Sequence, residues 1–113
     1  MAPGKFIGTL FQSRDAMHIA HLQTTSYAEH KALNKYYDGI LDLTDSFCES
    51  YFGRNKRVDI IIPESKNTDA ISHLKELRSI IDAERDNYTS ELQNLMDEMI
   101  SLINKTLYLL TLN

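Results

Sequence analysis

The sequence predicts an all-α domain folded as a bundle of four antiparallel helices. Only four glycines and two prolines interrupt 113 residues, so long stretches are free to be helical. Four stretches carry apolar residues at steps of three and four, the spacing of one helix face. The connections between them are short, long and short, which predicts two helical hairpins joined by a crossover. A chain of this length fits one domain, spanning 1–113.

The first two predicted helices span 5–23 and 27–52. A polar, β-branched run separates them and ends at Ser26. Ser26 and Glu29 form the S-x-x-E pattern of a capping box, in which each side chain satisfies a free amide of the new helix. Gly53 follows the second helix, and glycine is the usual stop at a helix C-terminus.

The long connection between helices two and three is predicted to cover 53–67. Its apolar part, Val58–Ile62, is β-branched and is followed by Pro63. We expect this part to lie on the bundle or on a neighbouring subunit, with a short strand as the alternative.

The third and fourth helices are predicted over 68–86 and 89–111. Asn67 or Thr68 is the expected cap of the third helix, because both side chains can accept from a free amide. The pair Asp86-Asn87 predicts a tight turn before the fourth helix.

Composition restricts the classes of function. The formal net charge is −4, and the one basic cluster is Arg54, Lys56 and Arg57, so strong binding to DNA is not expected. Cys48 is alone, which indicates a reducing compartment. No apolar run approaches the roughly 20 residues that cross a bilayer, so we expect no membrane contact and a cytoplasmic location.

Four carboxylates lie on one face of the second helix. Asp38, Asp42, Asp45 and Glu49 follow one another at steps of four, three and four. A solvated acidic face is the simplest interpretation of such a run.

Two histidines add a second kind of ligand. His18 lies late in the first helix, His30 lies in the first turn of the second, and His21 follows His18 by one turn. Imidazole nitrogen together with carboxylate oxygen suits iron, manganese or zinc. The histidines and the acidic face together therefore indicate a metal site.

The order and spacing of these residues resemble the ferroxidase signature of the Dps miniferritins. His18 is followed by His30 after twelve residues, by Asp45 after fifteen more and by Glu49 after four more. The string Thr44-Asp45-Ser46-Phe47-Cys48-Glu49 is similar to the T/D-D-x-x-A-E segment of that family. The resemblance covers residues 18–52 and implies a ferritin-like bundle.

The resemblance also implies an activity and a partner. Fe(II) would be bound and oxidised by peroxide or oxygen, and iron stored, at a site where His18 and His30 of one subunit face Asp45 and Glu49 of another. Iron is the implied metal, with manganese or zinc as alternatives. The implied assembly is a homo-oligomer, at least a dimer, with the twelve-subunit, dodecameric cage of that family as the larger form.

The neighbouring carboxylates Asp38 and Asp42 would be secondary ligands that attract cations. The sequence also looks like small proteins of tailed bacteriophages, which implies the host cytoplasm or the virion as its place.

A second class of function remains open. Where the miniferritin pattern has other residues, this chain has Ile19, Gln23, Ser26 and Asn34. Its connection over 53–67 also leaves little space for the short helix that the family has at this place. These departures favour a ferritin-like structural or interaction protein without chemistry, for example a phage or assembly component.

Overall fold

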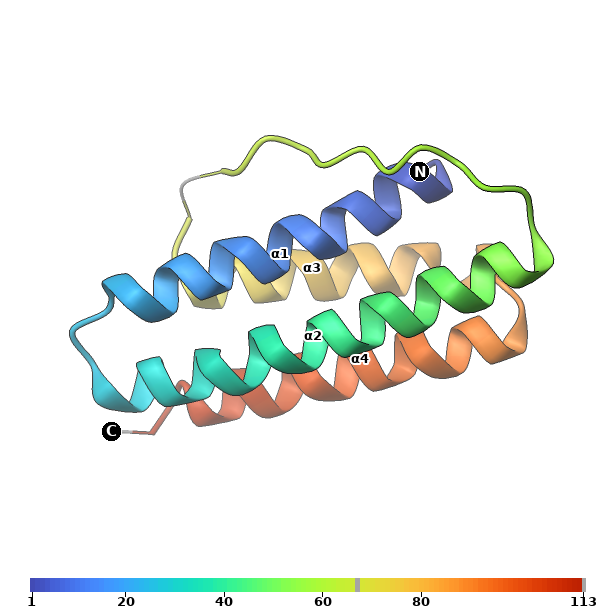
Figure 1. Ribbon diagram of the computed structural model, residues 1–113. Helices are drawn as coiled ribbons and strands as arrows, with labels where there is room; N and C mark the ends of the chain where they lie inside the picture. The colour runs from blue at the N-terminus through green and yellow to red at the C-terminus, as the bar shows by residue number, and fades with distance from the viewer. Residues whose placement is uncertain (67, 113) are drawn as a thin grey trace.

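A computed structural model describes residues 1–66 and 68–112 and shows four α-helices, with no strand among the described residues (Figure 1). The molecule measures 43 × 25 × 21 Å. The elements in order are α1 (Pro3–Gln23), α2 (Tyr27–Arg54), α3 (Ala70–Glu84), a single 3₁₀ turn (Arg85–Asn87) and α4 (Ser90–Leu109).

The helices are arranged so that each one runs antiparallel to both of its neighbours (Figure 1). α1 packs on α2, α2 on α4, α4 on α3, and α3 on α1. The contact between α1 and α2 is the most extensive, and α3 has the least contact with the rest. The predicted all-α class, the four helices and the long connection between the second and third are therefore confirmed.

The α1–α2 connection is fixed by hydrogen bonds among polar side chains. Ser26 Oγ accepts a hydrogen bond from the backbone N–H of Glu29 at 3.2 Å, which is the first half of the expected capping box. The Glu29 carboxylate does not return to Ser26; it accepts from the Thr24 hydroxyl at 3.1 Å. That hydroxyl also accepts from the Ser26 N–H at 3.1 Å. Thr24 therefore takes over the second half of the box.

The predicted end of the second helix at residue 52 is two residues too early. α2 continues through Gly53 to Arg54, and the amide of Asn55 closes the last turn on the carbonyl oxygen of Tyr51 at 2.9 Å. A glycine ends a helix when it takes a left-handed conformation, and Gly53 has no positive φ.

The third helix, by contrast, is shorter than predicted. It begins two residues later, at Ala70, because its cap is Asp69. The carboxylate of Asp69 accepts from the backbone N–H of Ser72 at 2.8 Å and from its hydroxyl at 3.0 Å. Thr68 therefore lies outside the helix, and the alternative cap, Asn67, lies outside the described residues. The expected turn at Asp86-Asn87 is the 3₁₀ turn. α4 covers 90–109 of the predicted 89–111.

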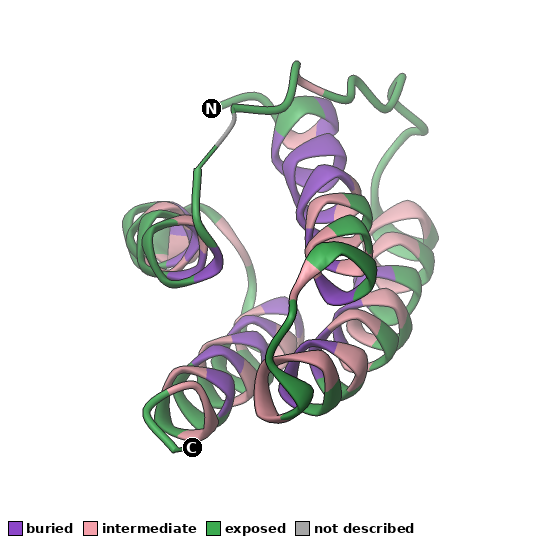
Figure 2. Ribbon diagram, turned by 90° about the vertical axis from the view of Figure 1, so that its left-hand side faces the viewer, coloured by how far each residue is buried: buried purple, intermediate pink, exposed green. Residues whose placement is uncertain are grey.

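The buried residues lie on the helix faces that point into the bundle, and most of them are apolar (Figure 2). At the end where the crossover begins, three aromatic rings meet. The centroid of Phe6 lies 5.5 Å from that of Phe47 and 5.6 Å from that of Tyr88, and Phe47 and Tyr88 are 5.2 Å apart. Such tilted ring pairs add stabilisation beyond their buried area. No helix among the described residues is long and apolar enough to cross a bilayer.

The crossover returns along α1 as an extended segment that touches the helix backbone. The N–H of Ile61 donates to the carbonyl oxygen of Gly4 at 3.1 Å. A Cβ at Gly4 would overlap the carbonyl oxygen of Asp59, and one at Gly8 would overlap that of Ile61. The two glycines, one turn apart, therefore form a groove that admits the segment. The expectation that the apolar part lies on the bundle is confirmed, whereas the alternative of a strand is not.

Two glycine-to-alanine substitutions should change the stability of the fold in opposite directions, because Gly8 lies in this groove and Gly53 lies in open space. Gly8→Ala pushes the crossover away and should lower the free energy of unfolding by about 1–3 kcal/mol, as overpacking does. Gly53→Ala meets nothing within 4 Å and should raise it by about 0.5–1 kcal/mol, because alanine is the better helix former. Urea unfolding of both variants measures the difference, and stabilisation by Gly8→Ala would contradict the groove.

Candidate functional site

Three imidazole rings and a tyrosine gather where α1 turns into α2. His21 is buried and stacks on His30, with ring centroids 3.7 Å apart and planes inclined by 17°. His18 stacks on Tyr37 at 4.2 Å, and its ring lies 6.0 Å from that of His21. The structure therefore places the two histidines of the predicted site at one end of the α1–α2 hairpin, with His21 between them.

His21 and His30 hold each other through a reciprocal pair of hydrogen bonds. Nδ1 of His21 lies 2.6 Å from the carbonyl oxygen of His30, and Nδ1 of His30 lies 2.8 Å from the carbonyl oxygen of His21. A carbonyl oxygen only accepts, so each Nδ1 carries the proton. In the neutral form of such a ring, the lone pair is on Nε2. Metal-binding histidines commonly have this arrangement, with the other ring nitrogen donating to a carbonyl.

The carboxylates of the predicted site lie on the outer surface of α2. Asp38, Asp42, Asp45 and Glu49 are all exposed. Burial, together with the nearby carboxylates of Asp45 and Glu49, raises the pKa of the neighbouring Cys48 thiol to about 11. Cys48 is therefore protonated at neutral pH and is a poor nucleophile.

The histidine end and the carboxylate end do not meet within one chain. His30 and Asp45 are fifteen residues apart on a continuous helix, which is about 22 Å at 1.5 Å per residue. Among the described residues, no three histidine, cysteine, aspartate or glutamate side chains lie together in a way that could hold a metal ion. The predicted ligand set of His18, His30, Asp45 and Glu49 would need a second chain, so it stays a prediction.

A second polar cluster joins three helices inside the bundle. Ser13 of α1 is fully buried, and its hydroxyl lies 2.7 Å from the hydroxyl of Tyr36 on α2 and 2.8 Å from Nε2 of His73 on α3. Burial lowers the pKa of His73, and Glu76 opposes that shift. Burial also raises the pKa of the Tyr36 hydroxyl. Both side chains are therefore neutral at pH 7, and the cluster is a hydrogen-bonded link between helices.

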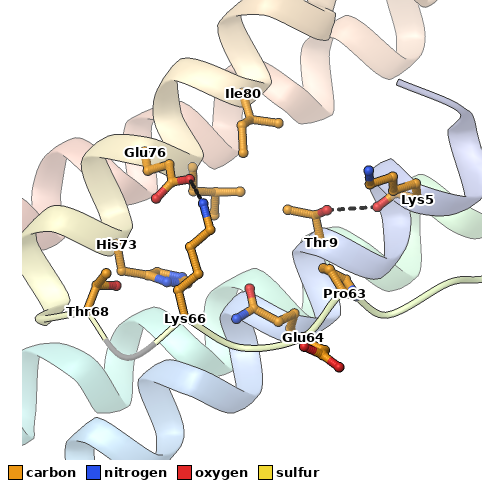
Figure 3. A pocket seen from close by; sticks show the side chains of 11 residues that line it. Lys5, Thr9, Pro63, Glu64, Lys66, Thr68, His73, Glu76 and Ile80 are labelled. Atoms are coloured by element: carbon orange, nitrogen blue, oxygen red, sulfur yellow. Dashed lines mark hydrogen bonds and ion pairs between the residues drawn. The ribbon is translucent and has the colours of Figure 1, made fainter.

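A cavity of about 260 Å³ lies beside this cluster, between α1, the crossover and α3 (Figure 3). Lys66 crosses its mouth and pairs with Glu76 at 3.2 Å. Gln12 donates to the hydroxyl of Ser65 at 3.3 Å and so ties the crossover to α1. The cavity marks the side on which α3 packs least closely.

The comparisons with known proteins match the chain to a protein family and to a phage protein. A family of unknown function, DUF5856, matches residues 21–110. The chain is similar to an uncharacterised 14.6 kDa protein from the mobD–ri intergenic region of Enterobacteria phage T4, with 30% identity over 114 residues. That alignment covers 96% of this chain and 87% of the phage protein. No solved structure matches the chain.

The lowered pKa of His73 predicts that acid destabilises the fold. The unfolded chain binds a proton at His73 near pH 6.5, whereas the folded chain does so only at lower pH. The contribution of His73 to the free energy of unfolding is thus fully present above about pH 7. It is lost as pH falls through 6.5 towards the folded pKa. Urea unfolding at pH 7.5 and 5.5 should show a smaller decline in His73→Gln than in the wild type; equal declines would contradict this assignment.

The reciprocal histidine pair predicts non-additive effects of substitution. His21→Ala and His30→Ala should each lower the free energy of unfolding by about 1–2 kcal/mol, because each removes the shared stack and one hydrogen bond. The double variant should cost less than the sum, since the stack is lost only once. Lys35→Ala, exposed on α2, is the control. Strict additivity in a double-mutant cycle would argue against the pairing.

Proposed function

We propose that this chain, which belongs to the DUF5856 family, is a ferritin-like iron-binding protein whose oxidation site is completed by a second copy of the chain. The order of neighbours around the bundle, with all adjacent helices antiparallel and the crossover between α2 and α3, supports a ferritin-like topology. The same topology is built by many proteins without chemistry, so the proposal of activity depends on the side chains.

The observation that carries the proposal is the arrangement of His21 and His30, whose rings stack and whose Nδ1 atoms bond to backbone carbonyls. Because Nδ1 of each ring is held in this way, Nε2 is the nitrogen that would bind a metal ion. Two imidazoles alone do not retain Fe(II), for which carboxylate ligands are also needed. Asp45 and Glu49, the carboxylates of the predicted ligand set, lie about 22 Å and about 28 Å from His30 along the same helix.

A two-fold related copy would join the two half-sites. If the α2 helices of two chains pack antiparallel, the His30 end of one lies opposite the Asp45 and Glu49 end of the other. Such an isologous contact forms two equal sites. His18, His21 and His30 would supply nitrogen from one chain, and the carboxylates of the other would neutralise the charge of the ion.

The exposed acidic face of α2 suits the delivery of iron to these sites. Asp38 and Asp42 lie between the histidine and the carboxylate ends and would raise the local concentration of cations. In the reaction, two Fe(II) ions lose one electron each, and one hydrogen peroxide takes up both electrons and two protons to give two water molecules. The chain itself holds the ions in place and leaves positions open for the oxidant.

A structural role in a phage is the second candidate. The exposed apolar side chains of the crossover, Ile60, Ile61 and Ile62, favour it, because such patches mark contacts with other proteins. Light scattering, which measures the size of the assembly, and an assay of Fe(II) oxidation together distinguish the two functions. A closed homo-oligomer that oxidises Fe(II) supports the iron protein, and a monomer or an open assembly without iron turnover supports the structural one.

Subunit complementation tests the shared site. Asp45→Ala with Glu49→Ala, and His18→Ala with His30→Ala, should each reduce Fe(II) oxidation, followed by near-ultraviolet absorbance, to the rate in buffer. When the two inactive variants are unfolded together and refolded, mixed dimers regain one intact site. About half the dimers are mixed, so roughly a quarter of the wild-type rate should return.

The control has the same change of charge elsewhere. Asp82→Ala with Glu98→Ala removes two exposed carboxylates of α3 and α4 and should leave the oxidation rate unchanged. A wild-type rate equal to that in buffer would rule out the oxidation chemistry. Activity in the separate carboxylate variant would rule out the proposed ligands.

A further inference from the structure

The crossover has one edge occupied and one edge free. In an extended chain, successive residues point their N–H and C=O groups to opposite edges. Ile61 donates to Gly4, and the carbonyl oxygens of Asp59 and Ile61 lie against the two glycines of α1. The backbone groups of the odd-numbered residues therefore face α1, and those of the even-numbered residues face away from it.

The free edge belongs to Val58, Ile60 and Ile62. Within the described chain no hydrogen bond reaches the backbone groups of these three residues. The side chains of the segment are exposed as well, by 41% at Ile60, 58% at Ile61 and 59% at Ile62. Edge strands in natural proteins are usually protected by charge, bulges or a covering element, because an open apolar edge pairs with another strand.

From this edge we infer that two copies of the chain associate by pairing their crossovers as antiparallel strands. Ile60 lies opposite the second copy's Ile60, with Val58 opposite Ile62 on either side. All three outward-facing residues then form ladder hydrogen bonds, and β-branched side chains meet across the strands. Contact of the same surface on both copies closes the pair and leaves no further edge.

Charge complementarity selects both the partner and the register. In the pairing centred on Ile60, Lys56 of each copy lies opposite Glu64 of the other. Among the described residues neither Lys56 nor Glu64 takes part in an ion pair within its own chain. The two are eight residues apart on an extended segment, about 26 Å, so they cannot reach each other within one chain.

The neighbouring registers bring like charges together. Shifting the second copy by two residues in one direction places Asp59 opposite its own counterpart. Shifting it by two in the other direction places Lys56 opposite Lys66. Like charges directly opposite each other destabilise a strand pair. The sequence around the free edge is therefore complementary to a second copy of itself in one register.

The contact of the segment with α1 lowers the entropic cost of pairing such a short strand. Isolated two-stranded ribbons are marginally stable in water, mainly because ordering them is costly. Here the segment is already extended and is held by the backbone of α1 at Gly4 and Gly8. The inference needs no metal and stands whether or not the chain handles iron.

Charge reversal with rescue tests the pairing on the full-length chain. The dissociation constant of the wild type is measured by sedimentation equilibrium at low ionic strength, where charge effects are least screened. Lys56→Glu alone, or Glu64→Lys alone, places like charges at both ends of the ribbon and should raise the dissociation constant roughly tenfold. The double variant restores opposite charges and should return the dissociation constant to that of the wild type.

The outcomes separate the pairing from damage to the fold. Both residues are exposed, and circular dichroism confirms that each variant keeps its helices. A wild type that stays monomeric at all accessible concentrations overturns the inference. A dimer whose dissociation constant is unchanged by the single charge reversals also overturns it. The same holds for a double variant whose dissociation constant stays as high as those of the single variants.

Discussion

The contact between the crossover and the glycine groove of α1 is the constraint on which the rest of the structure depends. It is a contact between two backbones, and no side chain larger than hydrogen fits at Gly4 or Gly8. Because the chain returns along α1 in this groove, α3 starts at the far end of the bundle and runs antiparallel to α1. That direction brings His73 beside Ser13 and leaves one edge of the crossover in solvent.

Much of the fold could be predicted because it depends on local patterns. Apolar spacing located the four helices, and Ser26 marked the start of the second. The errors arose where two local signals compete. Gly53 is a stop only in a left-handed conformation, and Thr68 and Asp69 can both cap a helix. The path of the crossover was not predictable, because it depends on Gly4 meeting a segment more than fifty residues away.

The site was predictable only in part, for the same reason. Spacing along the chain singled out His18 and His30, and the structure places them at one end of the hairpin. The role of His21 depends on the α1–α2 turn, which brings two carbonyl oxygens within reach of two rings. The link from Ser13 to His73 spans sixty residues, and no local pattern in the sequence indicates it. In both cases the deciding partner is remote in sequence.

The order in which the helices contact one another has a consequence for biosynthesis. α1 and α2 are consecutive and share the widest contact, so they can associate as soon as Arg54 has left the ribosome. α3 emerges next, yet its main neighbour is α4, which follows it in the chain and is made later. Until then Leu74, Leu77 and Ile81 have little apolar surface to cover them. The nascent chain therefore exposes this apolar face of α3 to chaperones and proteases until α4 has been synthesised and packs on it.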